Sequence, residues 1–268
     1  MAVMELLDGV ADLVREVSAT VIVPRFRALE DGEVTEKAPG DVVTAADTEA
    51  ERLLREGLER LLPGAPVVGE EAGSANPSLL NAVAGAEQAW LVDPLDGTTN
   101  FVSGSTDWGT MVALVRAGRT TASWMWHPTS GRMYRAELGS GAWCDETRLV
   151  VGGAPMDESR LVGAVLTRFL DESTRVAVAR NAWRFGEILP GRKCAAVEYP
   201  DVICGDHHFA LYWRTLPWDH APGTLLLTEA GGVVRRPDGT NYLPGDQRVG
   251  LLVARNATTW HLAIGLIN

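Results

Sequence analysis

The segment Trp90–Phe101 constrains this chain more than any other part of its sequence. An apolar run at residues 89–92 predicts a buried strand, and Asp93-Pro94 predicts the turn that ends it. A second carboxylate, Asp96, follows three residues after the first and directly precedes Gly97-Thr98. This order is typical of metal-bound carboxylates that face the first amides of a helix, where unpaired N–H groups and the helix dipole attract an anion. The segment therefore predicts metal-assisted chemistry on a phosphate, although an ordinary strand–turn–helix connection uses the same residue types.

The composition indicates a folded protein that keeps its cysteines reduced. The 268 residues can form one large core or two smaller ones, and 46% of them are hydrophobic. No apolar run approaches the roughly 20 residues that a membrane span requires, and the acidic, amphipathic first residues do not resemble a secretory signal. Cys144, Cys194 and Cys204 are odd in number and form no CxxC pair, so neither a disulfide scaffold nor a zinc site is indicated. We therefore expect a cytoplasmic protein without a membrane partner.

The net charge of the chain bears on its partners. A value of -11 argues against nucleic acid, because a nucleic-acid backbone requires a basic surface. A phosphorylated small molecule would also be repelled by an acidic protein unless bound divalent cations supplied positive charge. If the partner is a small phosphorylated metabolite, as the segment Trp90–Phe101 indicates, the charge implies divalent cations bound by the carboxylates.

Hydrophobic periodicity predicts an α+β or α/β protein with layered packing. We divide it into residues 1–153, which are helices on an antiparallel sheet with most of the polar motifs, and residues 154–268, a smaller α/β half. Turn residues at 35–44 indicate a hairpin or a mobile loop. Helices are predicted over 3–29, 47–62, 173–181, 219–230 and 257–267, and strands over 66–69, 89–92, 109–115, 121–126, 132–138, 161–166, 209–213 and 251–254.

Four short segments together resemble the inositol monophosphatase family, the lithium-sensitive magnesium phosphatases. They are Asp41–Asp47, Gly69–Glu71, Trp90–Phe101 and Trp218–Gly223, and they occur in the family's order at similar separations. The resemblance covers about residues 41–231 and is strong only at these segments. It implies an αβαβα sandwich of the sugar-phosphatase type, two or three Mg²⁺ ions, lithium sensitivity and a homodimer.

The resemblance also implies a set of metal ligands. One ion is expected at Glu70, Asp93, the carbonyl of Leu95 and Thr98, a second at Asp93, Asp96 and Asp219, and a weaker third near Glu70. These are hard oxygen donors, which Mg²⁺ prefers. Several carboxylates in one pocket repel each other unless cations neutralise them, so the residue types themselves are consistent with this assignment.

The same resemblance implies catalytic roles. Thr98, oriented by Asp47, would position the attacking water with help from Glu70, and the amides of Gly97 and Thr98 would hold the phosphate. One metal would lower the pKa of a bound water and another would stabilise the leaving oxygen. Each residue also has an ordinary interpretation, since Asp, Thr and Glu cap helices or face solvent. Lys37 is offset by one from the family's basic residue, so we leave it outside the site.

The residues expected to select the substrate depart from the family. Where the family has Gly-Ser/Thr-Ala-Ala, this chain has Lys193-Cys194-Ala195-Ala196, and Ala195 and Lys193 are candidates for substrate contact. Inositol-specific members use an acidic residue, about seven positions before the last metal-binding Asp, to bind a sugar hydroxyl. Tyr212 stands near that place in this chain. Asp219 and Tyr212 are both candidates for substrate contact. A carboxylate that accepts a hydroxyl hydrogen bond is not replaced by Tyr without changing what fits. Inositol phosphate as sole substrate is thereby in doubt, and Arg214 is available for a second phosphate or a carboxylate.

Other residues near these motifs are given structural interpretations. His207 and His208 are expected at a surface or interface, because adjacent strand residues face opposite sides. We expect His220 to point away from Asp219 and Trp218 to form a wall of the metal site.

We predict a Mg²⁺-dependent phosphomonoesterase for a small sugar, cyclitol or amino-alcohol phosphate. A histidinol-phosphate phosphatase, a fructose-1,6-bisphosphatase-like enzyme and a nucleotide 3′-phosphatase share the metal site and remain alternatives. A non-catalytic relative that binds metal and phosphate for regulation is the alternative from another class.

Overall fold

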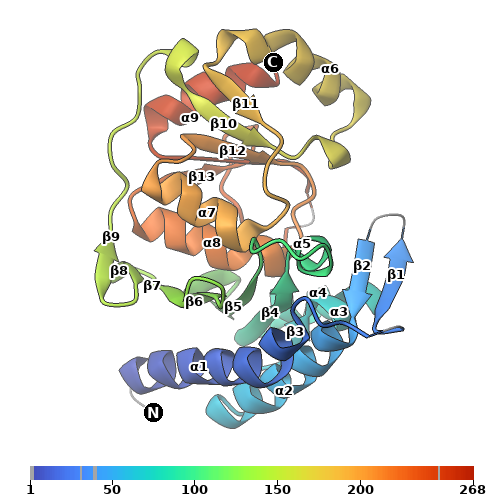
Figure 1. Cartoon of the computed structure of the whole chain (residues 1–268). Coiled ribbons are helices and arrows are strands. Elements are labelled where there is room, and N and C mark those ends of the chain that lie inside the picture. Colours follow the sequence, from blue (N-terminus) through green and yellow to red (C-terminus); the bar gives the residue numbers. More distant parts are fainter. Residues whose placement is uncertain (1–2, 31, 39–40, 247) are drawn as a thin grey trace.

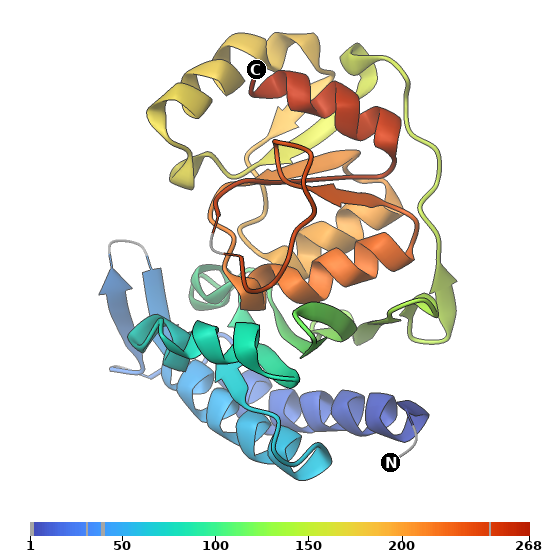
Figure 2. The same cartoon turned by 180° about the vertical axis from the view of Figure 1, so that it is seen from behind.

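Five layers of helix and sheet make up the computed structural model, which describes residues 3–30, 32–38, 41–246 and 248–268 (Figures 1 and 2). Helices α1 (Val3–Val17) and α2 (Ala45–Leu61) cover the outer face of a seven-stranded sheet. Helices α7 (Ala195–Cys204) and α8 (Pro217–Glu229) lie between this sheet and a five-stranded sheet, and α6 (Glu172–Asn181) and α9 (Ala257–Ala263) lie on the far side. The predicted layered α/β sandwich is confirmed.

The first sheet has the order β3-β4-β5-β6-β7-β8-β9. We predicted an antiparallel sheet, but β3 pairs with β4 in parallel, and only the other neighbours are antiparallel. The short strands β8 and β9 were not predicted, because runs of three or four residues carry little periodicity. The strands are β3 (Val67–Gly69), β4 (Gln88–Asp96), β5 (Gly109–Arg116), β6 (Arg119–His127), β7 (Arg132–Glu137), β8 (Gly141–Cys144) and β9 (Thr147–Leu149).

The core beneath this sheet explains why the first two helices form there. Val10 and Val14 of α1 and Leu54 and Leu58 of α2 are fully buried, at spacings that place them on one face of each helix. The predicted helix over 3–29 does not continue as a regular α-helix. It passes into a π turn at Ser18–Ile22 and a 3₁₀ turn at Val23–Arg25, which contains a proline that has no N–H to donate.

The second sheet has the order β11-β10-β12-β14-β13. Its strands are β10 (Val162–Val165), β11 (Glu187–Leu189), β12 (Phe209–Tyr212), β13 (Val233–Arg235) and β14 (Leu251–Ala254). Strands β10 and β12 are parallel neighbours, with Val165 opposite Leu211, so their carboxyl ends lie at the same edge. The predicted division at residues 153 and 154 falls in the segment between the two sheets and remains a prediction.

The predicted hairpin at 35–44 is present as β1 (Val34–Ala38) paired with β2 (Asp41–Thr44). Thr44 ends β2 and caps α2, so the hairpin is joined directly to the first layer of helices. Short helices α3 (Glu70–Ala75), α4 (Leu79–Gly85) and α5 (Thr98–Val102) follow β3 and β4. In the described part of the chain no helix is both long and apolar enough to cross a membrane.

Candidate active site

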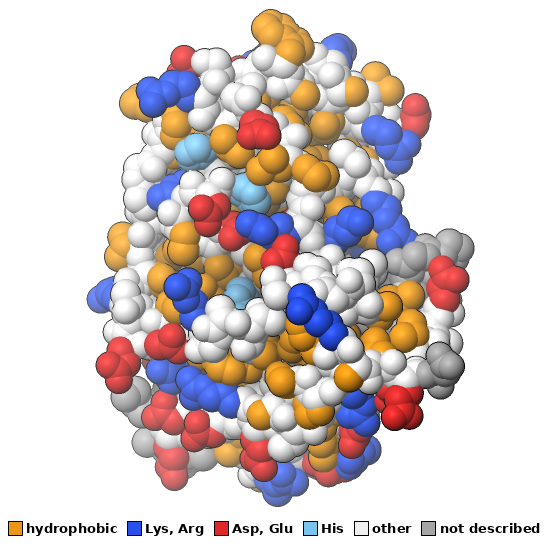
Figure 3. Space-filling model, in the orientation of Figure 1, with side chains coloured by type: hydrophobic (Ala, Val, Ile, Leu, Met, Phe, Trp, Pro, Cys, Tyr) orange, Lys and Arg blue, Asp and Glu red, His pale blue; other side chains and the backbone are white. Residues whose placement is uncertain are grey.

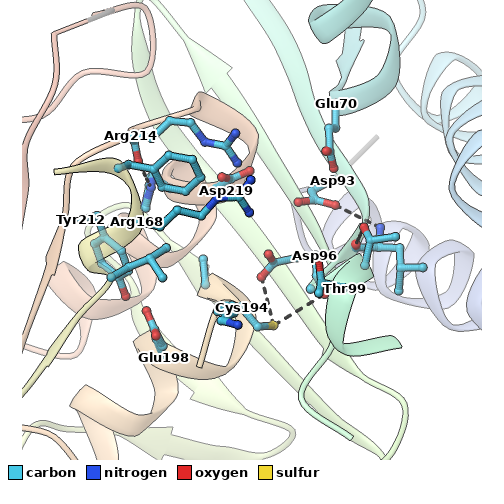
Figure 4. Close-up of a pocket in the computed structure, with 18 of the residues that line it drawn as sticks. Glu70, Asp93, Asp96, Thr99, Arg168, Cys194, Glu198, Tyr212, Arg214 and Asp219 are labelled. Carbon is cyan, nitrogen blue, oxygen red and sulfur yellow. Dashed lines mark hydrogen bonds between the residues drawn. The ribbon is translucent and has the colours of Figure 1, made fainter. Parts of the chain in front are cut away.

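A cavity of about 180 Å³ lies where the ends of β4, β10 and β12 meet the starts of α5, α7 and α8 (Figure 4). Residues from both sheets line it, although they are distant in the sequence. All five predicted metal-binding residues line it, namely Glu70, Asp93, Leu95, Asp96 and Asp219. So do the predicted phosphate- and substrate-binding residues Gly97, Thr98, Lys193, Ala195 and Tyr212. Asp47 does not line the cavity but is hydrogen-bonded to Thr98, which does.

An irregularity in β4 presents both carboxylates to the cavity. We predicted that the strand ends at Asp93, but β4 continues to Asp96. The pairing with β5 shifts between Asp93 and Asp96, and the carbonyl of Pro94 accepts a hydrogen bond from Thr110 Oγ1 at 2.9 Å. The two carboxylates therefore point into the same cavity instead of occupying regular strand positions (Figure 4).

Burial perturbs the ionisation of these carboxylates. Asp93 is 2% exposed, and burial together with the charges of Glu70, Asp96 and Asp219 raises its pKa well above the ordinary value. Burial also raises the pKa of Asp96 to about 6, although hydrogen bonds from the amide of Ala196 and the thiol of Cys194 act in the opposite direction. The amide lies 2.5 Å and the thiol 3.2 Å from Asp96 Oδ2. Ionised carboxylates are thus costly here without a compensating cation.

Asp47 joins helix capping to the candidate catalytic threonine. Its Oδ2 accepts from the amide of Thr44 at 2.8 Å and from the hydroxyl of Thr44 at 2.5 Å, which forms a capping box at the start of α2. Its Oδ1 lies 3.1 Å from Thr98 Oγ1, which is also 3.0 Å from the carbonyl oxygen of Leu95. Burial raises the pKa of Asp47 to about 7 despite the bonds from Thr44. The capping and catalytic interpretations of this residue are therefore compatible.

The hairpin brings a cation to the acidic side of the cavity. We left Lys37 outside the site, and it does not line the cavity, but its Nζ lies 3.1 Å from Glu70 Oε1 and 2.9 Å from Glu71 Oε1. Burial alone would lower the pKa of Lys37, but the two glutamates raise it overall. The buried carboxylate of Glu51, which the sequence did not single out, accepts from the amides of Glu71 and Ala72 and anchors the start of α3. Lys37 was noted in the sequence, but its offset by one residue from the family's basic residue gave no indication that it would contact Glu70.

Gly97 allows the chain to turn from β4 into α5. Its φ of +86° is in the left-handed region, and a Cβ would lie 2.8 Å from the carbonyl oxygen of Asp107. Another residue at this position would be strained both in its backbone and by contact. The turn places the first residues of α5, including Thr98, against the cavity.

The opposite wall comes from the second half. Lys193 has a φ of +59° and is exposed, and Ala195 begins α7. Glu198 in α7 was not predicted, because a helical glutamate usually faces solvent. It is 3% exposed, accepts from the amide of Arg192, and lies beside Tyr212 (Figure 4). Burial raises its pKa to about 7, against hydrogen bonds from Arg192 and Tyr212.

One of the histidine expectations requires correction. His207 is 4% exposed and therefore is not a surface residue, while His208 accepts from the amide of Val162 through Nδ1 at 2.9 Å. His220 lines the cavity, with Nε2 3.1 Å from the carbonyl oxygen of Arg214 and Nδ1 3.1 Å from the Tyr199 hydroxyl. Burial lowers the pKa of His220 to about 4, so it is a neutral structural link.

Trp218 does not line the cavity, contrary to expectation. It is buried in a hydrophobic cluster with Val68 and Val83 and packs against Gly73 of α3. Its contribution is to hold the start of α8, and hence Asp219, against the first sheet.

No group of three or more His, Cys, Asp or Glu side chains among the described residues is already arranged to hold a metal ion. The donors that line the acidic wall are nevertheless all oxygens, and the buried Asp93 and Asp96 carry unfavourable charge. This donor chemistry fits Mg²⁺, which prefers hard oxygen ligands.

Comparison with known proteins agrees with the resemblance that the four sequence segments indicate. A model described as the inositol monophosphatase family matches residues 4–266. The inositol-1-monophosphatase of Rhizobium meliloti (strain 1021) is 31% identical over 209 residues, covering 77% of this chain and 76% of that protein. A protein named Nus factor SuhB from Pseudomonas aeruginosa is 30% identical over 216 residues, covering 78% of each chain. A staphylococcal IMPase-I structure in complex with products is similar in fold, with a TM-score of 0.84 and 16% identity over 100% of this chain and 96% of that one.

Proposed function

Because the chain belongs to the inositol monophosphatase family, a family of metal-dependent phosphatases, we propose that it is a Mg²⁺-dependent phosphomonoesterase. Its substrate is a small sugar, cyclitol or related phosphate. The observation that carries the proposal is the pair of buried carboxylates, Asp93 and Asp96, that face one cavity beside the start of α5. Such a pair is costly in a protein that does not use it, since burial and mutual repulsion both oppose ionisation.

The ligands of the metal ions are the oxygens of the acidic wall. Glu70, Asp93, the carbonyl of Leu95, Thr98, Asp96 and Asp219 would hold two or three Mg²⁺ ions. When bound, these ions would supply positive charge for the phosphate, acidify the attacking water and stabilise the leaving oxygen. The raised pKa values of Asp93 and Asp96 support this assignment, because a bound cation would offset the burial and the repulsion that raise them.

The residues around Thr98 orient the attacking water. If the Thr98 hydroxyl donates to Asp47, its oxygen lone pairs face the cavity and accept a hydrogen bond from water. Asp47 is held in place by two hydrogen bonds from Thr44 to its Oδ2, which leaves Oδ1 directed at Thr98. Glu70, on the same side of the cavity, assists in positioning the water. The amides of Gly97 and Thr98 hold the phosphate oxygens, as the first amides of a helix have no partner within it.

Inositol phosphate is one candidate substrate among several, because one residue expected to contact it differs. By the resemblance, Tyr212 or a neighbouring residue stands where inositol-specific members present a carboxylate, and a phenol both donates and accepts. Histidinol phosphate, a fructose bisphosphate and a nucleotide 3′-phosphate therefore belong in the test panel with inositol 1-phosphate. The relative named Nus factor SuhB makes a regulatory role the second candidate. The presence of Thr98 together with Asp47 favours catalysis, because regulation alone requires no oriented hydroxyl.

Phosphate release across this panel, with Mg²⁺ and with a chelator, tests the proposal. We expect Mg²⁺-dependent release from at least one substrate, and loss of more than about 99% of it in Asp96→Asn, since removal of a group that acts on transition-state charge typically costs 10²–10³ in rate. Glu146→Gln, which removes a charge in the exposed turn between β8 and β9, is the control and should retain full activity. An Asp96→Asn protein as active as the parent would contradict the mechanism, and no release from any substrate would favour the regulatory alternative.

A further inference from the structure

We infer that His127 is a positioning residue for the candidate metal ligand Asp96, and that it acts through the backbone of Ala196. The inference rests on the proposed function for the role of Asp96. It adds a residue that does not line the cavity and that lies outside the four sequence segments. The evidence is a pair of hydrogen bonds that joins the end of β6, the start of α7 and the end of β4.

Ala196, the second residue of α7, is bonded to the first sheet through both of its backbone polar groups. Its amide donates to Asp96 Oδ2 at 2.5 Å, and its carbonyl accepts from Nε2 of His127 at 2.6 Å. Asp96 ends β4 and His127 ends β6, so the two bonds reach α7 from the strands on either side of β5. The thiol of Cys194, just before α7, also donates to Asp96 (Figure 4). The carboxylate is therefore oriented by the start of a helix that His127 holds in place.

The sequence of α7 leaves the carbonyl of Ala196 free for His127. In an α-helix this carbonyl would accept from the amide four residues later, but that residue is Pro200, which has no N–H. Ala196 is fully buried, and a buried carbonyl without a partner is costly. His127 supplies the missing donor from the first sheet. The contact therefore has a cause in the sequence of both elements.

Gly109 of β5 makes room for this contact. It pairs with Asp96 in the register of β4 and β5, and it precedes Thr110, which pairs with Trp126 of β6. A Cβ at Gly109 would lie 3.0 Å from Cβ of Ala196 and 3.2 Å from Cδ2 of His127. The missing side chain thus lets Ala196 and His127 approach each other over the middle strand.

Burial keeps His127 neutral, and the neutral ring is sufficient for this role. The side chain is 8% exposed, and its ring packs beside Tyr134 with the ring centres 4.9 Å apart. Burial lowers the pKa of His127 to about 4, although the hydrogen bond to Ala196 acts in the opposite direction. Because a carbonyl can only accept, the proton of the neutral ring lies on Nε2.

Short contacts of this kind orient Asp96 more strongly than distant charges do. Acidic and basic side chains are interspersed on the described surface that Figure 3 shows. Charges of mixed sign cancel in part at a distance and are screened by salt, whereas the bonds to Asp96 act at 2.5 and 3.2 Å. Loss of the His127 contact should therefore alter how Asp96 holds a cation.

Two substitutions at His127 separate positioning from packing. His127→Leu removes the donor, whereas His127→Gln keeps an N–H group at about the reach of Nε2. We expect His127→Leu to weaken Mg²⁺ binding in calorimetry about 10-fold and to lower kcat at saturating Mg²⁺ about 10-fold, with KM within about 2-fold of the parent, as is typical when a metal ligand loses its support. His127→Gln should recover most of both losses. Equal losses in the two variants, or parent values in both, would overturn the inference.

His208 provides a matched control. Its ring is also bonded to the backbone, at the amide of Val162 in the second sheet, and it does not line the cavity. His208→Leu should lower the thermal midpoint of unfolding but leave kcat and the Mg²⁺ affinity unchanged. If it reduced them as much as His127→Leu does, general destabilisation would explain both variants and the inference would fail.

Pro200→Ala adds a further test, because it supplies the helical amide that the parent lacks. In this background His127→Leu should lower the thermal midpoint by less, since the carbonyl of Ala196 then has another donor. The losses of kcat and of Mg²⁺ affinity should persist, because the helical amide does not connect Ala196 to β6. Recovery of kcat and affinity along with stability would overturn the positioning role.

The Mg²⁺ measurement separates failure of this inference from failure of the proposed function. If the parent releases phosphate and His127→Leu matches it in kcat and in Mg²⁺ affinity, the inference fails and the proposed function stands. If the parent binds Mg²⁺ but hydrolyses none of the substrates, a loss of affinity in His127→Leu that His127→Gln restores would support the inference. The absence of turnover would then count against the proposed function alone.

Discussion

Replacing Asp96 by asparagine should stabilise the metal-free protein. Burial raises the pKa of Asp96 from 3.8 to about 6, so the ionised carboxylate opposes folding. One pKa unit corresponds to about 1.4 kcal/mol, which gives an unfavourable contribution of about 3 kcal/mol once the residue is fully ionised. Because the pKa is raised in the folded state, the free energy of unfolding is highest below pH 3.8, where Asp96 is protonated in both states. It falls by about this amount as the pH rises through 6. Asparagine avoids the loss and still accepts from the amide of Ala196.

Thermal unfolding in a chelator at pH 8 and at pH 5 measures this effect. At pH 8 we expect Asp96→Asn to unfold roughly 5–10 °C above the parent, for about 2–3 kcal/mol in a chain of this size. At pH 5 the advantage should fall to about half, because the parent carboxylate is then largely protonated in the folded state. Saturating Mg²⁺ should reduce or reverse it, since the parent gains binding energy that the variant lacks. An Asp96→Asn protein no more stable than the Glu146→Gln control at pH 8 in chelator would refute the electrostatic argument.

Other predictions follow from the same geometry. Thr98→Val keeps the shape of the side chain but removes the hydroxyl that lies 3.1 Å from Asp47, and it should lower kcat about 100-fold with little change in stability. An unchanged kcat would show that this hydroxyl does not position the attacking water. Gly97→Ala should lose about 1–3 kcal/mol of stability, measured by urea unfolding, because its φ is +86° and its Cβ would meet Asp107. Apparent Mg²⁺ affinity should weaken as the pH falls below 6, since protons compete at Asp96, so activity should persist to lower pH at higher Mg²⁺; a pH profile that ignores Mg²⁺ would contradict this. Millimolar Li⁺ should inhibit phosphate release by competing for one Mg²⁺ position, and a flat inhibition curve would exclude this.

Local signals in the sequence were sufficient for most of the first half of the fold. Helix spacing and strand runs located α2, β5, β6 and β7 within a few residues, because each is long and periodic. The short strands β8, β9, β11 and β13 were not predicted. Their formation depends on pairing with strands already in place, which local periodicity does not encode.

The candidate site was predictable wherever one segment carried several functional residue types. Asp93, Asp96 and Thr98 could be found in this way, since few structural roles require two carboxylates directly before the start of a helix. Lys37 and Glu198 could not, because their relation to the cavity depends on a hairpin register and on the burial of one helix. A glutamate in a helix is usually solvated, and only tertiary packing shows that Glu198 is not.

The central claim is that acidic side chains from distant segments bind divalent cations that in turn hold the phosphate. A crystal structure with Mn²⁺ in place of Mg²⁺ and with inorganic phosphate tests it most directly, because anomalous scattering locates the metal independently of the protein atoms. We predict two or three metal peaks among Glu70, Asp93, Asp96 and Asp219, with phosphate oxygens bound to them and to the amides of Gly97 and Thr98. Metal peaks only elsewhere, or phosphate bound at a site without metal, would contradict the account.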